Sequence, residues 1–242
     1  MRFHYLIAAH NEETNIDRAC QRLIPISKKF PGSHLYLLDN GSTDDTWSKC
    51  LKLQSLHPNL ITALHDDRAG IGIAFRMGLK SLIRSELSLN RYDWIVLAAA
   101  DLPFGLSDLQ SVLDQCAESD RDDWVYVGSK AHPLSKIQRS PQRRLGTFAL
   151  YHLRKGILGL KTKDTQGSIF IRGDIAHYLS DFKSDDYFFS IEVIDRAERD
   201  GAVMEVPVNL EPEHRSSRVR PFRDGWRMLR QLIAYRQARE SK

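Results

Sequence analysis

The sequence predicts an α/β protein built on one mostly parallel central sheet with helices on both faces. Short apolar runs at 3–9, 34–39, 60–66 and 94–100 each have the length of a buried strand. Amphipathic segments separate these runs. The 242 residues are 42% hydrophobic and 27% charged, which is typical of a globular chain. Because continuous apolar strands alternate with helices, we expect a parallel sheet that is covered on both faces.

In the first half of the chain, each strand run is followed by a segment with helical features. The first helix begins after Asn11 and Glu12, residue types that favour a helix N-terminus. The turn NGSTDDT precedes the second helix, and the glycine-bearing turn RAGIG precedes the third. Helices are therefore expected near 13–29, 44–55 and 68–83, and again from about Leu106.

The second half changes character near 130–145, where SKAHPLSKIQRSPQRR is basic, polar and weakly periodic. We interpret this stretch as a mobile loop. A helix at 145–158, a strand ending the run DTQGSIFIR, a helix at 188–201 and a strand at 202–210 are expected to follow. No linker or change in composition divides the chain, so residues 1–242 are expected to form a single domain.

The C-terminal tail predicts a basic amphipathic helix near 221–239. Phe222, Trp226, Leu229 and Ile233 recur at helical spacing among several arginines. Packing of this stripe against the domain is the simpler interpretation. The alternative is that the helix lies on an anionic membrane surface.

Composition excludes several classes of protein. No run of about 18 apolar residues occurs, so no transmembrane helix is expected, and the apolar run after Met1 is too short for a signal peptide. Three scattered cysteines without a CxxC pattern favour reduced, packed thiols rather than zinc ligands. The net charge of +4 fits an anionic ligand without specifying one. We therefore expect a cytoplasmic protein.

Polar residues follow several of the predicted strands at the point where each strand ends. Asn11 and Glu12 follow the first strand, Asp39 and Asn40 end the second, and Asp101 ends the fourth. Ligands of open parallel sheets bind beyond the carboxyl ends of the strands, and the glycines of RAGIG would let backbone N–H groups approach a phosphate. These features indicate a nucleotide site. Taken singly, each residue could instead be a helix cap or turn former.

An ordered series of motifs resembles glycosyltransferase family 2, whose members have the GT-A fold. The series consists of LIAAHNEETNI, LYLLDNGSTDDT, RAGIGIAFRMGL and VLAAADLPF. In the second half, VGSKAH, QRS, KDTQGSIFIR, FFSIEVIDRA and VPVNLEPEHRSSRVRPF resemble the polyprenyl-phosphate sugar synthases, in particular dolichyl-phosphate glucosyltransferases and mannose synthases. The resemblance spans residues 3 to 236. It implies an inverting transfer of a hexose from a UDP- or GDP-sugar to a polyprenyl phosphate.

The same resemblance implies where a divalent metal would bind. In the family the fourth strand ends in an Asp-x-Asp motif that holds the metal against the nucleotide diphosphate, and here the triplet reads Ala99-Ala100-Asp101. One carboxylate is missing, so Asp101 is the expected ligand for Mg²⁺ or Mn²⁺, with substrate and water supplying the other oxygens. A cap on the helix near Leu106 is the alternative role for Asp101.

The resemblance also implies roles for other residues. Asp101, Glu192 and Arg218 are expected to act in catalysis, with Glu192 either a base or a residue that orients a neighbour. Asp164 and Gln166 are expected to contact the sugar. The donor nucleotide is expected to contact Ala9, Asn11, Glu12, Asp39, Asn40, Gly70, Gly72 and Ala100. The phosphates of donor and acceptor are expected to contact Lys130, Arg139, Ser140, Arg143, Arg215 and Ser217.

Two other functions remain open from the sequence. The protein could transfer the sugar to a small soluble acceptor, in which case Asp101, Asp185 or Asp186 would have to serve as general base. Alternatively, loss of a carboxylate at Ala99 could leave a degenerate fold that only binds nucleotide sugars. Peripheral contact with the cytoplasmic face of a membrane stays open, and no nucleic acid partner is expected.

Overall fold

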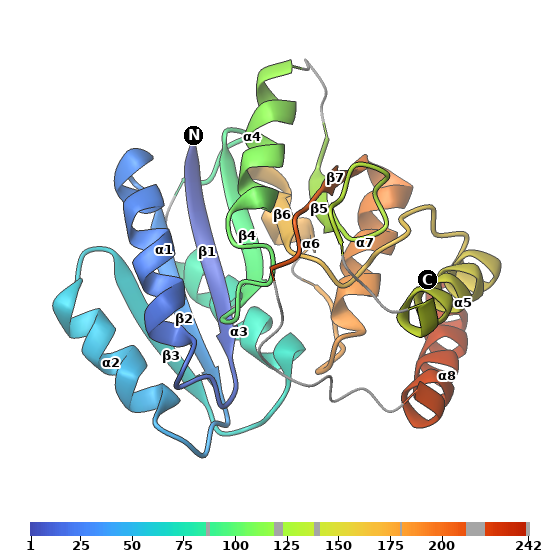
Figure 1. Ribbon diagram of the computed structural model, residues 1–242, viewed down its shortest axis with the longest axis horizontal. Coiled ribbons are helices and arrows are strands. Elements are labelled where there is room, and N and C mark those ends of the chain that lie inside the picture. Colours follow the sequence, from blue (N-terminus) through green and yellow to red (C-terminus); the bar gives the residue numbers. More distant parts are fainter. Residues whose placement is uncertain (86–87, 119–122, 138–140, 180, 212–220, 241–242) are drawn as a thin grey trace.

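A seven-stranded sheet forms the centre of the structure, which is a computed structural model (Figure 1). It describes the chain except residues 86–87, 119–122, 138–140, 180, 212–220 and 241–242, and the side chains of 118, 141–145, 179 and 221–224. The strand order is β3-β2-β1-β4-β6-β5-β7. The strands are β1 (Arg2–Ala9), β2 (His34–Asn40), β3 (Ile61–Asp66), β4 (Asp93–Ala99), β5 (Val125–Ser129), β6 (Ile169–Arg172) and β7 (Val203–Pro207).

The first four strands form a parallel half-sheet, because β1 pairs in parallel with both β2 and β4, and β2 pairs in parallel with β3. β6 then runs antiparallel to β4 and β5, and β5 pairs in parallel with β7. The central parallel strands are apolar on both sides, as sheets covered by helices require. The predicted α/β class with a mostly parallel sheet is confirmed.

Helices cover both faces of this sheet (Figure 1). α1 (Ile16–Lys29), α2 (Thr46–Leu56) and α4 (Ser107–Glu118) lie on one face. α3 (Ile71–Arg84), the short α6 (Ala176–Leu179) after the 3₁₀ turn Gly173–Ile175, and α7 (Phe189–Asp200) lie on the other. α5 (Pro141–Leu158) and α8 (Pro221–Glu240) pack against each other at one side of the molecule.

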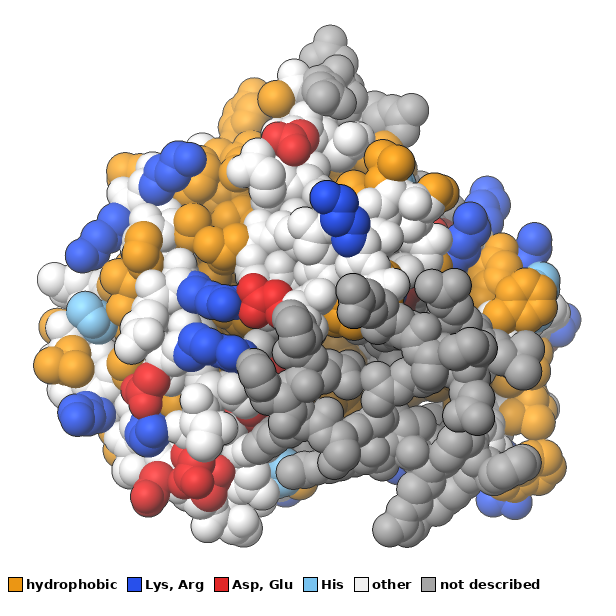
Figure 2. All heavy atoms as spheres, in the orientation of Figure 1, with side chains coloured by type: hydrophobic (Ala, Val, Ile, Leu, Met, Phe, Trp, Pro, Cys, Tyr) orange, Lys and Arg blue, Asp and Glu red, His pale blue; other side chains and the backbone are white. Residues whose placement is uncertain are grey.

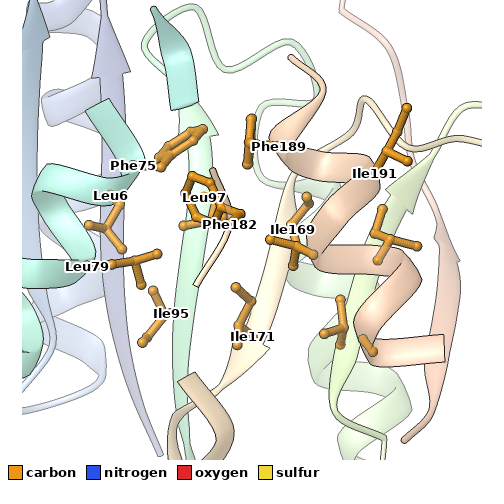
Figure 3. Packing of buried hydrophobic residues seen from close by; sticks show 14 of the residues in the cluster. Leu6, Phe75, Leu79, Ile95, Leu97, Ile169, Ile171, Phe182, Phe189 and Ile191 are labelled. Atoms are coloured by element: carbon orange, nitrogen blue, oxygen red, sulfur yellow. The ribbon is translucent and has the colours of Figure 1, made fainter. Parts of the chain in front are cut away.

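Each face of the sheet has its own hydrophobic core. On the α3 and α7 face, Phe75 and Leu79 pack with Leu97 of β4 and Ile169 of β6 (Figure 3). On the other face, buried side chains of α1, α2 and α4 pack against the alternate residues of the strands, and Cys20 and Cys50 belong to this core. Alternating strand residues thus point into two cores, which fixes the register of every central strand.

The elements differ from expectation in several places. Residues 125–129 form β5, which the sequence pattern did not predict. α5 begins at Pro141, so the last part of the expected loop at 130–145 is helical, and residues 138–140 of that loop lie outside the described residues. Among the α8 side chains that the structure describes, Leu232 is the buried one. Trp226 is 58% exposed and Ile233 45% exposed, so these two do not pack against the domain as the simpler interpretation proposed.

No helix in the described part of the chain combines the length and apolar character needed to cross a membrane. On the face shown in Figure 2, Lys and Arg side chains are spread over the surface, with a smaller number of Asp and Glu side chains mostly in the left half of the view.

Candidate active site

The parallel strands bring the predicted polar residues to one rim of the sheet. Ala9 pairs in register with Asp39, and Ala8 pairs with Ala99. The Ala100 N–H donates to the Ala8 carbonyl at 3.0 Å, which extends this pairing past the end of β4. Ala9 and Ala100 are both 1% exposed, so they support the rim from beneath. The loops after β1, β2, β3 and β4 therefore meet at this edge, as parallel topology requires.

The loops after β1 and β2 are joined by side-chain hydrogen bonds. Asn11 has a positive φ of 55°, a conformation that Asn tolerates better than most residues. Its N–H donates to Ser42 Oγ at 2.9 Å, and its Oδ1 accepts from the Thr43 N–H at 2.8 Å. The Glu12 N–H donates to Thr46 Oγ1 at 2.8 Å. These bonds fix Asn11 and Glu12 over the end of β2.

Asp39 lies at the bottom of this rim and contacts a histidine that the sequence interpretation missed. Its carboxylate is fully buried, and Oδ2 lies 2.6 Å from Nδ1 of His65. Nε2 of His65 lies 2.9 Å from Asp67 Oδ1. The centroid of the imidazole ring lies 5.1 Å from the centroid of the Trp47 ring, and the two rings are tilted by 35°. Hydrogen bonds to Asp67 and Asp39 raise the pKa of His65.

Asn40 ties the end of β2 to the start of α3. With its amide oriented to satisfy both partners, Asn40 donates to the Ala9 carbonyl at 2.9 Å and accepts from the Gly70 N–H at 3.0 Å. The Gly72 N–H donates to the Asp185 carbonyl at 2.9 Å. A Cβ at Gly72 would lie 2.1 Å from the Ser184 carbonyl oxygen, which explains the glycine. In this structure both glycine N–H groups are therefore engaged within the protein.

Asp101 is exposed at the rim, directly after β4. Its carbonyl accepts a hydrogen bond from Arg18 Nη2 at 3.0 Å, and Leu102 has a positive φ of 42° as the chain turns away. Ala99 offers no ligand atom. No cluster of three or more His, Cys, Asp or Glu side chains in the described ranges could hold a metal ion. The side chains at this point fit a divalent cation only through the single carboxylate of Asp101, with other oxygens supplied from outside the protein.

Lys130 belongs to a buried network of charged groups behind the rim. Its Nζ lies 3.0 Å from Asp164 Oδ2, and its N–H donates to the same oxygen at 2.9 Å. Burial would raise the pKa of Asp164, but Lys130 and the backbone donors more than offset this and lower it. Glu205 accepts from the Asp164 N–H at 3.1 Å. Arg154, which is 3% exposed, adds a cation close to both carboxylates. Lys130 and Asp164 thus neutralise each other.

The loop 164–168 is held at both ends. Asp164 Oδ1 accepts from the Gln166 N–H at 3.0 Å, and Ser168 Oγ donates to Asp108 Oδ2 at 2.5 Å. A Cβ at Gly167 would lie 1.7 Å from the Gly128 carbonyl oxygen, so the loop packs directly on β5. The Gln166 side chain remains exposed, while its carbonyl accepts from Lys130 Nζ at 3.0 Å.

A cavity of about 90 Å³ opens between this loop and the end of β4. Its walls come from Ile71, Phe75, the end of β4 at 97–99, the turn at 102–105, Asp108, the loop at 165–169, Tyr187, Phe189 and Ser190. A wider hollow of about 630 Å³ lies along α3 and β3. Asp66 and Arg68 line it at the end of β3, but most of its lining, including Arg76, Lys80 and Arg84, belongs to α3. We assign the smaller cavity to the site because it opens at the end of β4, between Ala99 and the turn after Asp101.

Glu192 lies at the start of α7 and holds the loop at 183–185. Its carboxylate accepts from the Lys183 N–H at 2.7 Å, and from both the N–H, at 3.1 Å, and the hydroxyl of Ser184. Arg76 of α3 donates to the Lys183 and Ser184 carbonyls at 3.0 and 2.8 Å. The geometry fits an orienting role for Glu192, the second of its two predicted roles.

The predicted phosphate-binding residues other than Lys130 lie outside the described residues. These are Arg139, Ser140, Arg215, Ser217 and Arg218, together with the side chain of Arg143. After β7, the described part of the chain continues to residue 211. Glu211 pairs with Arg22 at 2.8 Å, and its N–H donates to the Pro103 carbonyl at 2.9 Å. Residue 211 is thus fixed beside the turn that follows Asp101.

The mostly parallel sheet with its antiparallel β6 has the architecture of the GT-A fold. The profile of the family described as "Glycosyl transferase family 2" matches residues 5–173, more than half of the chain, so the protein belongs to that family of enzymes. A polyprenol monophosphomannose synthase of Mycolicibacterium smegmatis is 26% identical over 215 residues, which cover 85% of this chain and 76% of that protein.

Solved structures support the fold. A mannosyl-3-phosphoglycerate synthase from Rubrobacter xylanophilus superposes with a TM-score of 0.66 at 15% identity, covering all of this chain and 75% of that one. A glucosyl-3-phosphoglycerate synthase from Mycobacterium tuberculosis, solved with Mn²⁺, UDP and glucosyl-3-phosphoglycerate, gives a TM-score of 0.61 at 20% identity, covering 96% of this chain and 77% of that one.

Proposed function

We propose that the protein transfers a hexose from a UDP- or GDP-sugar to a polyprenyl phosphate with inversion at the anomeric carbon. The observation that carries this proposal is the convergence of Asn11, Glu12, Asp39, Asn40 and Asp101 at one rim beside a cavity. The related polyprenol monophosphomannose synthase supports the choice of acceptor.

The donor would lie across the rim. Glu12 would contact the base and ribose, and the buried Asp39 and Asn40 would hold this part of the rim from beneath, together with Ala9 and Ala100. The diphosphate would lie toward Gly70, Gly72 and Asp101. A divalent metal, Mg²⁺ or Mn²⁺ held by Asp101, would neutralise charge on the departing diphosphate. The M. tuberculosis enzyme solved with Mn²⁺ and UDP has the same fold, which supports this expectation.

The chemistry needs little base assistance. An oxygen of the acceptor phosphate attacks the anomeric carbon while the bond from that carbon to the diphosphate oxygen breaks, and the nucleoside diphosphate leaves. Because the acceptor is already anionic, the main task is to bring two anions together and stabilise the leaving group. We assign this task to Lys130, Arg139, Ser140 and Arg143 on the acceptor side, and to Arg215, Ser217 and Arg218 on the donor side.

We further propose that the enzyme acts at the cytoplasmic face of a membrane. Trp226 and Ile233 are exposed on α8. The guanidinium carbon of Arg230 lies over the Trp226 ring, 5.3 Å from its centroid. Exposed aromatic and aliphatic side chains next to arginines suit the interface of an anionic bilayer.

A transfer assay tests the function. Purified protein is incubated with labelled UDP- and GDP-hexoses and undecaprenyl phosphate, with and without Mn²⁺, and 3-phosphoglycerate serves as a soluble acceptor in a parallel arm. We expect label in the lipid fraction, and Asp101→Asn should reduce it at least 100-fold without lowering the melting temperature, whereas Asp114→Asn on the exposed side of α4 should leave it unchanged. Transfer only to 3-phosphoglycerate would replace the lipid acceptor, and binding without any transfer would favour a nucleotide-sugar-binding protein.

A further inference from the structure

His65, near the end of β3, joins two carboxylates that come from different elements. Its Nδ1 lies 2.6 Å from Asp39 Oδ2, and its Nε2 lies 2.9 Å from Asp67 Oδ1. A carboxylate oxygen accepts hydrogen bonds, so each contact needs a proton on the ring nitrogen, and a neutral imidazole carries a proton on one nitrogen only. The two contacts together therefore fit the imidazolium form of His65, which can donate from both nitrogens.

The two carboxylates differ in their surroundings. Asp39 is fully buried, and its Oδ1 has no hydrogen-bond partner among the residues that the structure describes, so this carboxylate depends on His65 as a donor. The Asp67 side chain is 99% exposed, and water can replace a partner that is lost there. When His65 loses a proton, we therefore expect the ring to keep the proton on Nδ1, toward Asp39, and to release Asp67.

Asp67 begins a segment that packs on the turn after β2. A Cβ at Gly41, whose φ is +72°, would lie 2.7 Å from the Asp67 carbonyl oxygen. The segment ends at Gly70, whose N–H donates to the side-chain oxygen of Asn40 at 3.0 Å. Together with the bridge through the imidazole, these contacts hold the segment 67–70 against the end of β2.

The turn after β2 also holds the loop that follows β1. Ser42 and Thr43 bind Asn11, and Thr46 accepts from the N–H of Glu12. Asn11 and Glu12 belong to the residues expected to contact the donor. A shift of the segment after β3 would move this turn, and with it the donor contacts of the β1 loop.

The charged groups around the imidazole favour its protonated form. Asp39 faces the ring from β2, and Asp66 and Asp67 act on it from the end of β3 and the residue that follows. Asp66 is itself paired with Arg68. The neighbouring ring on α2 is that of Trp47, which carries no charge. Hydrogen bonds to Asp67 and Asp39 raise the pKa of this histidine, so the protonated form persists to a higher pH than in a free histidine.

We propose that His65 is a positioning residue of the donor site. In its doubly protonated form it joins Asp39 to Asp67, and the turns joined in this way hold the donor-binding residues of the β1 loop in place. The inference rests on the proposed function, because it requires that a nucleotide sugar binds at the rim. It adds that the affinity for the donor is highest while His65 carries both protons, and that it falls as the pH rises and one proton leaves.

Calorimetric titration tests the inference, because it measures donor binding without an acceptor. The probes are UDP- and GDP-hexoses with Mg²⁺, titrated across pH 6–9, while ¹⁵N NMR of the histidine rings follows the titration of His65. At the acidic end, NMR should show both nitrogens of His65 protonated. The Kd of the donor should rise about 3- to 10-fold as His65 loses its proton, which is the effect of one net hydrogen bond.

Two variants separate the bridge from the charge of the ring. The amide of His65→Gln offers one NH₂ group and one oxygen, so it can serve Asp39 but not both carboxylates; its Kd at pH 6.5 should rise about 3- to 10-fold and lose the pH dependence due to His65. Asp67→Ala should raise the Kd by a similar factor, although removal of a negative charge alone would favour an anionic donor. The matched controls Asp114→Ala on α4 and His57→Gln at the end of α2 should bind as wild type.

Several outcomes would overturn the positioning role and leave the proposed function standing. These are an unchanged Kd in the folded variants, tighter donor binding by Asp67→Ala, a wild-type Kd that stays constant while His65 titrates, and a ring that carries one proton already at pH 6. If His65→Gln does not fold, Asp67→Ala decides, since its side chain is exposed. Failure of the wild-type protein to bind any nucleotide sugar would overturn the proposed function together with this inference.

Discussion

At the scale of single residues, Gly167 has no room for a side chain. The Cβ of an alanine would lie 1.7 Å from the Gly128 carbonyl oxygen, which belongs to the backbone of β5 and cannot easily move. The same loop carries Asp164 and Ser168, whose hydrogen bonds define one wall of the cavity. A change at Gly167 therefore disturbs stability and the wall of this cavity together.

We expect Gly167→Ala to lower the free energy of unfolding by about 1–3 kcal/mol, the usual cost of overpacking, or by more if β5 shifts. Chemical denaturation measures this change. Gly156→Ala in α5 is the matched control, because a Cβ there has nothing within 4 Å and alanine favours a helix by about 1 kcal/mol. Equal stability of Gly167→Ala and wild type would mean that the loop does not pack on β5 as described.

His4 makes stability depend on pH. It is 1% exposed on β1, neither ring nitrogen has a hydrogen-bond partner among the described residues, and burial lowers its pKa to about 4. The unfolded chain binds a proton near pH 6.5, whereas the folded chain does not until about pH 4. As far as His4 is concerned, the free energy of unfolding has its full value above pH 6.5 and decreases as the pH falls from 6.5 toward 4.

Because of His4, the free energy of unfolding should decrease by roughly 2–3 kcal/mol between pH 7 and 4.5. His4→Leu should show a correspondingly smaller loss when unfolding is followed at both pH values, while His57→Gln at the partly exposed end of α2 should behave as wild type. Identical acid sensitivity of His4→Leu and wild type would show that His4 is not held neutral by the fold.

Residues at strand ends were the part of the site that the sequence could predict. Asp39 and Asp101 follow apolar runs, and parallel topology brings such ends together. His65 could not be found in this way. It lies near the end of β3 opposite Asp39 in the pairing of β2 with β3, and that register is a property of the folded sheet. Asp108 was missed for a similar reason, because only the packing of α4 against the loop at 165–168 brings it to the cavity.

At the scale of elements, the loop at 183–185 joins α3 to α7. Arg76 of α3 binds its carbonyls, and Glu192 of α7 binds its N–H groups. The Asp185 carbonyl in turn accepts from the Gly72 N–H at the start of α3. Glu192 therefore influences the donor rim through this loop, without facing the cavity itself.

This arrangement predicts the effect of Glu192→Gln. The amide oxygen can accept from the loop, but its NH₂ group cannot, so the loop should loosen and the KM for the donor should rise about 3- to 10-fold. Turnover should fall less than about tenfold and keep its pH profile. Steady-state kinetics across pH 5–9 distinguish the two roles. Loss of a general base would instead slow turnover by roughly 100- to 10,000-fold and remove the acidic limb of the profile, and that result would identify Glu192 as the base.

The prediction of secondary structure was weakest for elements that depend on contacts with distant parts of the chain. The strand β5 is a short run between polar segments, and its pairing with β6 and β7, which are distant in sequence, defines it. The tail was correctly predicted as a helix, but it carries two apolar stripes. Met228, Leu232 and Tyr235 pack on the core, and this leaves the other stripe, with Trp226 and Ile233, exposed. Periodicity alone does not say which stripe meets the domain.

At the scale of the whole molecule, α8 lies at the opposite side of the sheet from α2 (Figure 1). Figure 1 also shows that α8 begins near the edge of the molecule at which β1 ends, so its first turns lie on the side of the rim. Two residues of α8 bind Asp186, the neighbour of Tyr187 at the cavity. Arg227 Nη2 forms an ion pair with Asp186 Oδ2 at 2.6 Å, and Gln231 Nε2 donates to the same oxygen at 3.0 Å. A membrane that contacts Trp226 would therefore lie close to the proposed acceptor side of the site.

This placement predicts that the protein binds vesicles that contain anionic lipid and that Trp226→Ala weakens binding roughly tenfold, equivalent to about 1.4 kcal/mol. Sedimentation with phosphatidylglycerol vesicles measures the change, and neutral vesicles or high salt should also weaken binding because arginines flank the tryptophan. Leu56→Ala at the end of α2 is the matched control, since Leu56 is 61% exposed but lies on the other side of the molecule. The Trp226→Ala variant should transfer the sugar to a water-soluble short-chain polyprenyl phosphate at the wild-type rate. If Trp226→Ala reduces that transfer as strongly as it reduces vesicle binding, the residue contacts the acceptor itself and α8 is part of the active site rather than a membrane contact.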